Sequence, residues 1–150
     1  MAIALATVTK SISNLQVSGL IIKDIGTIPV EVGSRSPMLI PAYPLVTDIT
    51  LERDSFGGGS TAKMTLSYTL NYIFCYVPIG AGRVSVLEYY DDMVSMATAI
   101  LDAVIAIDTF DGGIDIQPLP LTAIGVTVAD PAGNEYLGAN YGFRVMEFIN

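Results

Sequence analysis

The sequence predicts a single α+β domain with a mostly antiparallel sheet built of hairpins, an N-terminal helix, and one long helix packed on the sheet. Two observations lead to this fold class. Strand-like segments follow one another around glycine-rich turns, which favours antiparallel pairing, and two other segments have the apolar spacing of helices. A length of 150 residues is typical of one domain, so residues 1–150 are assigned to a single unit with one core.

An N-terminal helix is expected over residues 4–17. Its apolar side chains recur at a spacing that places them on one helical face, and Gly19 follows as a C-terminal stop. These apolar residues are Leu5, Val8, Ile12 and Leu15. The next stretch, residues 20–32, is rich in Ile and Val but alternates poorly between apolar and polar side chains.

A proline-rich segment follows, with Pro37, Pro41 and Pro44 close together. Proline has no backbone N–H and cannot donate to a regular ladder of strand hydrogen bonds. The segment is therefore expected to be an extended connection that lies over the surface. A strand is expected directly after it, at residues 46–53.

The clearest pattern in the chain predicts a strand at residues 63–77. Apolar and aromatic side chains occupy every second position, and Thr, Ser and Asn fill the gaps until Ile73, where both sets become apolar. A pleated strand sends the two sets to opposite faces, so the first set predicts the core face, and the end after Ile73 is expected to be covered on both faces. The first set consists of Met64, Leu66, Tyr68, Leu70, Tyr72, Phe74 and Tyr76.

A glycine-rich run separates these two strands. It consists of Phe56, Gly57, Gly58, Gly59 and Ser60. Glycine accepts almost any backbone conformation, so the run predicts a long, mobile hairpin tip. A phosphate-binding loop is the weaker interpretation, because the run lacks the Gly-Lys-Ser/Thr ending and leads into a strand instead of a helix.

A long helix is expected to begin at Ser85, which forms a capping box with Glu88. It is expected to end before Asp111 and to lie across the sheet through an apolar stripe. The stripe comprises Leu87, Tyr90, Val94, Ala97, Leu101 and Val104, widened by Ile100 and Ile105. Two more strands, at residues 121–128 and 141–149, flank a turn-rich segment and predict a closing hairpin.

The composition indicates that part of the surface is covered by other subunits. Charged residues make up 15% of the chain and apolar residues 51%, whereas an ordinary domain carries ~25% charged residues. A thick core under a surface of Ser, Thr and Gly is the alternative explanation. We favour contacts between sister subunits, as in obligate oligomers.

Charge and residue usage argue against nucleic-acid binding and against catalysis. The net charge is −8, and the seven basic residues are scattered singly, so no basic stripe can grip phosphates. The chain has no histidine, which removes the usual general base and the commonest metal ligand. The single cysteine, Cys75, lies in an apolar strand and is expected to be a packed, unreactive thiol. No catalytic residue and no cofactor are predicted.

Three acidic residues are the weak candidates for a metal site. Asp108, Asp111 and Asp115 lie near glycines after the long helix, where carboxylates could hold Ca²⁺. Their spacing departs from the alternating ligand pattern of calcium loops, and acids beside glycine are ordinary turn residues. The sequence therefore predicts no metal site, although ion binding at this cluster stays open.

No membrane segment is expected. The N-terminus has no basic region before its apolar stretch, so a signal peptide is not predicted. The most apolar helical stretch, residues 93–107, falls short of the ~20 residues that span a bilayer. A single cysteine also fits a protein made in a reducing cytoplasm.

In its element order the chain resembles the tail terminator, or tail completion, proteins of long-tailed bacteriophages. The features that carry the resemblance are the N-terminal helix, the proline-rich segment at residues 36–44, the strand–GGGS–strand hairpin, the helix from Ser85 and the closing hairpin that ends at residues 141–148. The resemblance covers nearly the whole chain but includes no diagnostic motif. It implies a structural virion protein that is assembled in the host cytoplasm. The family has no catalytic motif, so the resemblance assigns no role to any single residue of this chain.

The resemblance implies a homo-oligomeric ring, typically hexameric, that caps the tail tube, joins it to the head–tail connector and lets DNA pass without specific binding. Two irregular stretches are the candidates for partner contacts. These are the hairpin tip, with Phe56, Gly57, Gly58, Gly59 and Ser60, and the proline-rich segment, with Pro37, Pro41, Tyr43 and Pro44. Another neck or connector ring is one alternative. A domain that binds a small ligand between Tyr68, Tyr72, Phe74 and Tyr76 is the other.

Overall fold

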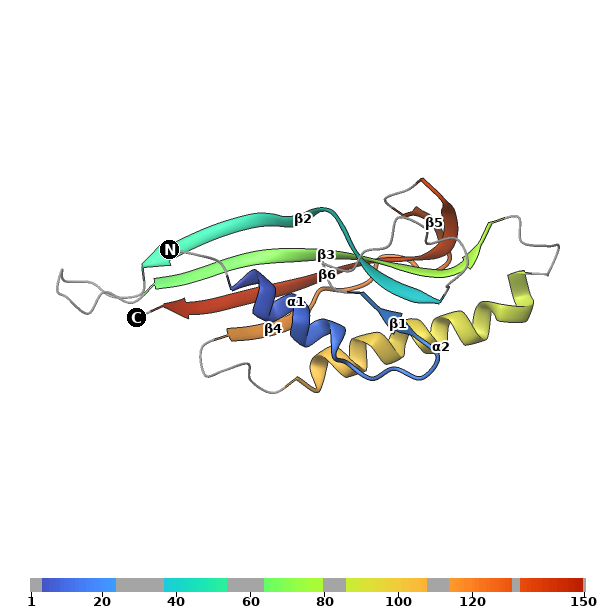
Figure 1. Ribbon diagram of the computed structural model, residues 1–150, viewed down its shortest axis with the longest axis horizontal. Helices are drawn as coiled ribbons and strands as arrows, with labels where there is room; N and C mark the ends of the chain where they lie inside the picture. Colours follow the sequence, from blue (N-terminus) through green and yellow to red (C-terminus); the bar gives the residue numbers. More distant parts are fainter. Residues whose placement is uncertain are drawn as a thin grey trace.

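The computed structural model describes residues 4–23, 37–53, 64–79, 86–107, 114–130 and 133–149. The elements in chain order are α1 (Leu5–Ser13), β1 (Ile21–Ile22), β2 (Met38–Arg53), β3 (Met64–Pro78), α2 (Val86–Ile105), β4 (Ile114–Pro118), β5 (Val126–Ala129) and β6 (Glu135–Ile149). They form one elongated unit in which a curled sheet lies on one side and both helices on the other (Figure 1). The predicted α+β class and the mostly antiparallel sheet are confirmed.

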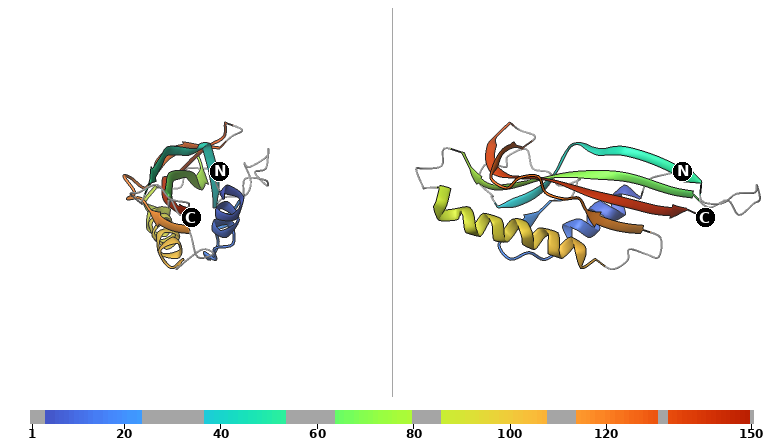
Figure 2. Two further views of the ribbon diagram at one scale, coloured as in Figure 1. Left: turned by 90° about the vertical axis from the view of Figure 1, so that its left-hand side faces the viewer. Right: turned by 180° about the vertical axis from the view of Figure 1, so that it is seen from behind.

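The sheet has the strand order β1-β2-β3-β6-β4, and β5 also pairs with β6. The β1–β2 pair is parallel and every other pair is antiparallel. The long strands β2, β3 and β6 form its centre, and their common curl is visible when the molecule is viewed from one end (Figure 2). One strand therefore separates β6 from β2, and β6 alone links β4 and β5 to the rest of the sheet.

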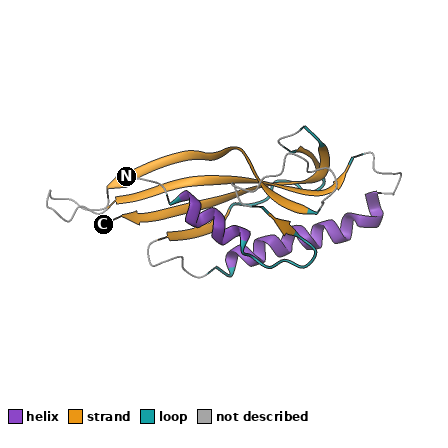
Figure 3. Cartoon of the chain, viewed as in Figure 1, coloured by secondary structure: helices purple, strands orange, loops and turns teal. Residues whose placement is uncertain are grey.

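The core lies under the face of β3 that the alternation predicted. Leu66, Tyr68, Leu70, Tyr72 and Phe74 are all buried and belong to one core cluster. The cluster continues into α1, β6 and α2, and the secondary-structure colouring shows both helices gathered on this side of the sheet (Figure 3). We call this face of the sheet the inner face and the opposite one the outer face.

One end of the sheet is covered on its outer face as well. A second cluster of buried side chains contains Met38 and Ile40 of β2, Cys75 of β3, Val128 of β5 and Tyr136 of β6. This confirms the prediction that the strand is covered on both faces after Ile73, which packs against the cluster. Over the remaining length of β3 the outer face carries Ser, Thr and Asn side chains.

The proline-rich segment is not a surface connection, and that prediction was wrong. Residues 38–53 form one continuous strand, β2, and its first four residues are buried. The strand tolerates its prolines because pairing with β3 is interrupted between Pro41 and Val46, so Pro44 needs no ladder hydrogen bond. The side chain of Asn71 fills the interruption by donating to the carbonyl of Leu45 at 3.3 Å and to Thr47 Oγ1 at 2.9 Å.

Helix α1 ends earlier than predicted, at Ser13 instead of residue 17. Its last turn is rich in short polar side chains, and the hydroxyl of Ser13 donates to the carbonyl of Lys10 at 2.7 Å. Such side chains compete with the helical backbone and favour termination. At its beginning the helix is held by Glu147 of β6, whose carboxylate accepts from the backbone N–H of Ala4 at 3.1 Å.

Helix α2 buries a stripe shifted from the predicted one. Met93, Ala97, Ile100 and Val104 are buried, whereas Tyr90 and Ile105, both assigned to the stripe from the sequence, are exposed. The tyrosine hydroxyl of Tyr141, on β6, donates to the carbonyl of Ala97 at 2.7 Å. The predicted capping box lies outside the described part of the helix, since Ser85 and the Glu88 side chain are not described.

The closing hairpin is confirmed in outline and corrected in extent. Its strands are β5, four residues long, and β6, which begins at Glu135 instead of residue 141. Asp130 shapes the turn by accepting hydrogen bonds from the backbone N–H of Asn134 at 2.9 Å and from the Tyr136 hydroxyl at 3.1 Å. The sequence reading missed β4, a five-residue strand that pairs with the second half of β6.

Candidate assembly surface

The residues predicted to contact partners separate into three groups. Tyr43 is 70% exposed and Pro44 is also exposed, at the middle of β2. Pro41 is buried and Pro37 is half-buried at the start of the strand. The hairpin-tip candidates, residues 56–60, lie outside the described residues.

One long edge of the sheet is open along β2. This strand pairs with β3 on one side, and on the other side it pairs with β1 only at Met38 and Leu39. From residue 42 to residue 53 no strand of the described chain covers this second side. Three large apolar side chains are exposed along the same stretch: Tyr43, Ile49 and Leu51. An open edge with apolar side chains is a template for pairing with another strand.

A bulge in this edge strand is held by Arg144 of β6. The pairing of β2 with β3 shifts between Thr47 and Thr50, and Asp48 has a positive φ of 53°. The guanidinium of Arg144 donates to the carbonyl of Asp48 at 2.8 Å, to Thr69 Oγ1 at 3.1 Å and to Thr50 Oγ1 at 3.3 Å. A left-handed aspartate is costly unless its surroundings fix it, so these bonds stabilise the bulge.

The opposite edge of the sheet is β4. It pairs with β6 on one side, and no strand of the described chain covers its other side. Next to this edge is a pocket of about 490 Å³ lined by Ile105, Ile107, Asp115, Ile116, Gln117 and Pro118. Ile105 is 64% exposed, so apolar surface is accessible here too. Asp115 is half-buried, and its side chain accepts a hydrogen bond from Gln117 at 3.2 Å.

The two open edges run in opposite directions. Each neighbouring pair among β2, β3, β6 and β4 is antiparallel, and this path contains four strands. β2 and β4 are therefore antiparallel to each other. If a second copy were placed beside the first by rotation about an axis along the strands, its β4 would lie antiparallel to the β2 edge, which is the pairing that strand hydrogen bonds favour.

Ion binding, which the sequence left open, gains no support from the described residues. They contain no group of three or more His, Cys, Asp or Glu side chains that could hold a metal ion. Of the three aspartates considered for calcium, Asp115 lies on β4, while Asp108 and Asp111 are outside the described residues. Cys75 is fully buried, and burial raises the pKa of its thiol to about 12, so it is protonated at neutral pH.

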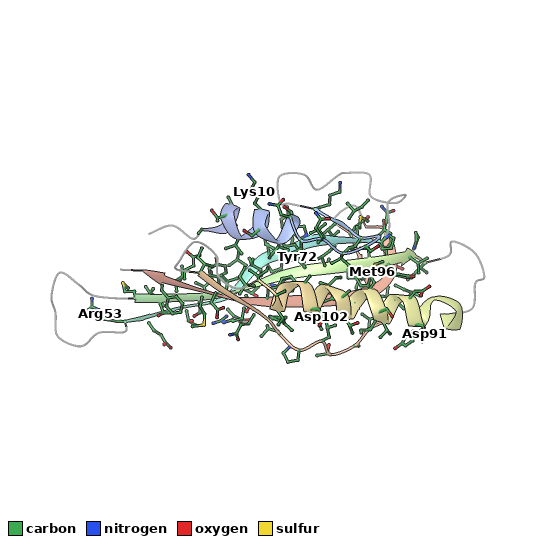
Figure 4. The ribbon with its side chains drawn as sticks, turned by 90° about the horizontal axis from the view of Figure 1, so that it is seen from below. Lys10, Arg53, Tyr72, Asp91, Met96 and Asp102 are labelled. Carbon is green, nitrogen blue, oxygen red and sulfur yellow. The ribbon has the colours of Figure 1, made fainter. Side chains whose placement is uncertain are left out.

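The aromatic side chains of β3 pack into the core more than they line a pocket. Tyr68, Tyr72 and Phe74 are buried, and the ring of Tyr72 lies 5.4 Å from that of Phe143. Tyr76 is half-buried and contributes to a pocket of about 400 Å³ between α2 and the segment after α1. Figure 4 shows Tyr72 between the helices and the sheet.

Two members of this surface were not singled out from the sequence as contact residues, Arg144 and Ile105. Alternation in the closing strand could have placed Arg144 on the outer face, because Phe143 and Val145 on either side of it are buried. No local signal could reveal that it reaches across β3 to β2.

No helix among the described residues has the length and hydropathy needed to cross a membrane. Searches of protein-family models and of curated protein sequences find no match to this chain.

Proposed function

We propose that this chain is a structural protein whose copies form a closed ring by joining the β2 edge of one copy to the β4 edge of the next. The observation that carries the proposal is the pair of open, oppositely directed edges at the two sides of one sheet. Head-to-tail contact between two different surfaces gives a ring when the rotation closes, and it covers both edges in every copy.

The β2 edge is longer than the strand proposed to pair with it. Residues 42–53 extend over ~40 Å at the usual rise of a strand, whereas the five residues of β4 extend over ~17 Å. Side-chain contacts beyond the strand ladder therefore supply much of the ~800 Å² that each partner contributes to a standard interface. The exposed side chains of Ile49 and Leu51 on one edge, and the pocket beside Ile105 on the other, supply apolar contacts for such a junction.

The proposal also places α2 across the inner face of the sheet. Met93, Ala97 and Val104 share one core cluster with side chains of β3 and β6, which supports this arrangement. With both helices on the inner side, the outer face and the two edges of the sheet are left uncovered by the helices (Figure 2).

Within this class of assembly we propose the role of a phage tail terminator. The ring, typically hexameric in such proteins, would sit on the last ring of the tail tube, stop its polymerisation and present a docking face to the head–tail connector. The net charge of −8 supports passage of DNA without binding, because an acidic channel repels phosphates. A ring that stops tube polymerisation by its shape needs no catalytic group.

Two measurements test the function. Native mass spectrometry of the purified chain is expected to show a closed oligomer of one fixed size. Electron microscopy of particles made without this protein is expected to show tails that form but neither end correctly nor join heads. Normal-length tails attached to filled heads would exclude the terminator role, and a ring that binds the connector but not the tail tube would favour another neck component.

A further inference from the structure

Two opposite charges on the outer face have no oppositely charged partner within the described residues. Among the described residues, the half-buried Arg144 side chain donates to two threonine hydroxyls and one backbone carbonyl. Asp115, also half-buried, accepts from the neutral amide of Gln117 within the same described part of the chain. A guanidinium is suited to bind a carboxylate, and a half-buried charge gains from such a partner.

These two charges lie toward opposite edges of the sheet. Asp115 is on the edge strand β4. Arg144 is on β6, but its guanidinium extends away from β4 and reaches β2, where it bonds to Asp48 and Thr50. The positive charge is thus presented over the β2 edge strand, and the negative charge is carried by the β4 edge strand.

Strand register puts both charges at the same height. Thr50 is paired with Ser67, Ser67 with Met146, and Met146 with Asp115, so one straight row of residues crosses all four strands. In the proposed ring, neighbouring copies are related by a rotation about an axis parallel to the strands, with no shift along that axis. Each row of paired residues in one copy then continues into the same row of the next copy. Asp115 of the second copy then lies beside Thr50, the residue that the Arg144 guanidinium contacts.

The separation between strands brings the groups within reach. Neighbouring strands lie ~4.8 Å apart, so an outward carboxylate on the next strand is within a side-chain length of a guanidinium anchored over β2. Asp115 points outward, because its neighbour Ile116 on β4 is buried in the core cluster on the inner face.

A single carboxylate fits this position better than a polyanion such as DNA. Asp48 and Glu52, also on β2, are exposed, and the chain as a whole carries a net charge of −8. A chain of phosphates would bring many negative charges against these acids, whereas one carboxylate brings a single charge to the guanidinium.

We infer that Arg144 of one copy binds the Asp115 carboxylate of the next copy and so fixes the register of the junction between β2 and β4. This inference rests on the ring proposed above. The pair adds electrostatic specificity to a junction whose remaining contacts are apolar side chains and backbone hydrogen bonds.

Charge reversal tests the pair. Arg144→Glu and Asp115→Lys each place like charges at every junction, so each variant alone is expected to assemble at least about tenfold more weakly than the wild type. An equimolar mixture of the two variants is expected to associate again. In the mixture a copy that keeps Arg144 meets a copy that keeps Asp115, and the introduced glutamate meets the introduced lysine. Native mass spectrometry distinguishes the two chains by mass.

Matched controls are available on the helices. Lys10→Glu on α1 and Asp91→Lys near the beginning of α2 make the same charge changes at exposed helix positions (Figure 4), and both variants are expected to assemble like the wild type. Circular dichroism checks that each variant is folded. Restoration by mixing also separates a lost contact from misfolding, because two misfolded chains do not restore each other.

The outcomes separate this inference from the proposed function. If the wild type forms rings and either single variant assembles equally well, the pair does not exist. If both variants are impaired and the mixture stays impaired, the effects arise within one chain, and the inference is again wrong while the ring stands. A wild-type chain that stays monomeric up to millimolar concentration overturns both the ring and the pair.

Discussion

At the scale of single residues, the alternation along β3 has the most direct consequence. Leu70 is fully buried in the core cluster, whereas Ser67 on the same strand lies half-buried on the outer face. Leu70→Asp is expected to prevent folding, because an unpaired buried charge costs several kcal/mol, a large part of a typical domain's stability. Ser67→Asp is the matched control and should lower stability by less than about 1 kcal/mol. A cooperative thermal transition for Leu70→Asp would show that the assignment of faces is wrong.

The buried thiol of Cys75 predicts a sensitivity to alkaline pH. Burial raises its pKa to about 12, well above the ordinary value of a thiol, and the negative charge of the nearby Asp130 raises the pKa further. The folded state therefore holds its proton more tightly than the unfolded state does. Its stabilising contribution is complete below pH 9 and is lost as pH rises from there towards 12.

Urea titrations at a series of pH values measure this effect. The wild type is expected to lose stability above pH 9, and Cys75→Ala is expected to flatten the early part of that loss. Buried tyrosines contribute only at higher pH, since the pKa of Tyr141 is raised by burial from an ordinary value near 10. Identical pH profiles for the two proteins would contradict the assignment to Cys75.

Sequence patterns predicted the inward residues better than the outward ones. The inner face of β3 follows from alternation alone, because burial repeats with the pleat of a strand. The roles of Arg144 and Asp115 depend on which residues the register of four strands aligns, and no local pattern specifies that register. From the sequence alone, the low content of charged residues predicts that some surface contacts other subunits, but it does not show which residues form that surface.

At the scale of elements, β3 was predicted over nearly its whole length, whereas β2 and β6 were predicted only over their second halves. Proline argued against a strand at residues 38–44, yet tertiary pairing with β3 and β1 places the segment inside the sheet. The short strand β4 has too few residues for a recognisable period, and its position depends on β6. In α2 the predicted stripe was right at Ala97, Ile100 and Val104, but the sequence left out the buried Met93 and included the exposed Tyr90.

Gly138 lies where the backbones of β6 and β3 leave no room for a side chain. A Cβ atom at this position would lie 1.6 Å from the carbonyl oxygen of Phe74, which is backbone and cannot move aside alone. Gly138→Ala is expected to cost about 3 kcal/mol or more by disturbing the central strand pair. For Gly142→Ala, also on β6, the nearest atom is the end of the flexible Leu119 side chain at 2.9 Å, so this variant should cost about 1 kcal/mol.

Chemical denaturation measures the difference between these two variants. Equal free energies of unfolding would mean that β6 shifts to relieve the contact at Gly138. A larger loss for Gly142→Ala than for Gly138→Ala would place the tight contact elsewhere.

At the scale of the whole molecule, the two open edges separate assembly from folding. Leu51 is 48% exposed at the β2 edge, and Ile79 is similarly exposed at the end of β3, away from that edge. Leu51→Asp is expected to weaken ring formation at least about tenfold, because it places a charge in an apolar junction, and to change monomer stability little. Ile79→Asp is the matched control and should assemble normally.

Analytical ultracentrifugation over a range of concentrations compares the two variants. Loss of assembly by Ile79→Asp but not by Leu51→Asp would place the subunit contact at the other end of the molecule.

The central position of β6 has a consequence for biosynthesis. This strand pairs with β3, β4 and β5, and its residue Glu147 binds both Tyr68 and the beginning of α1. Until the ribosome has added residues 135–149, β4 has no place in the sheet, and the N-terminal helix lacks its anchor. We therefore expect a nascent chain to present only one of the two surfaces that we propose to join. Rings are then expected to form only from released chains and not on polysomes.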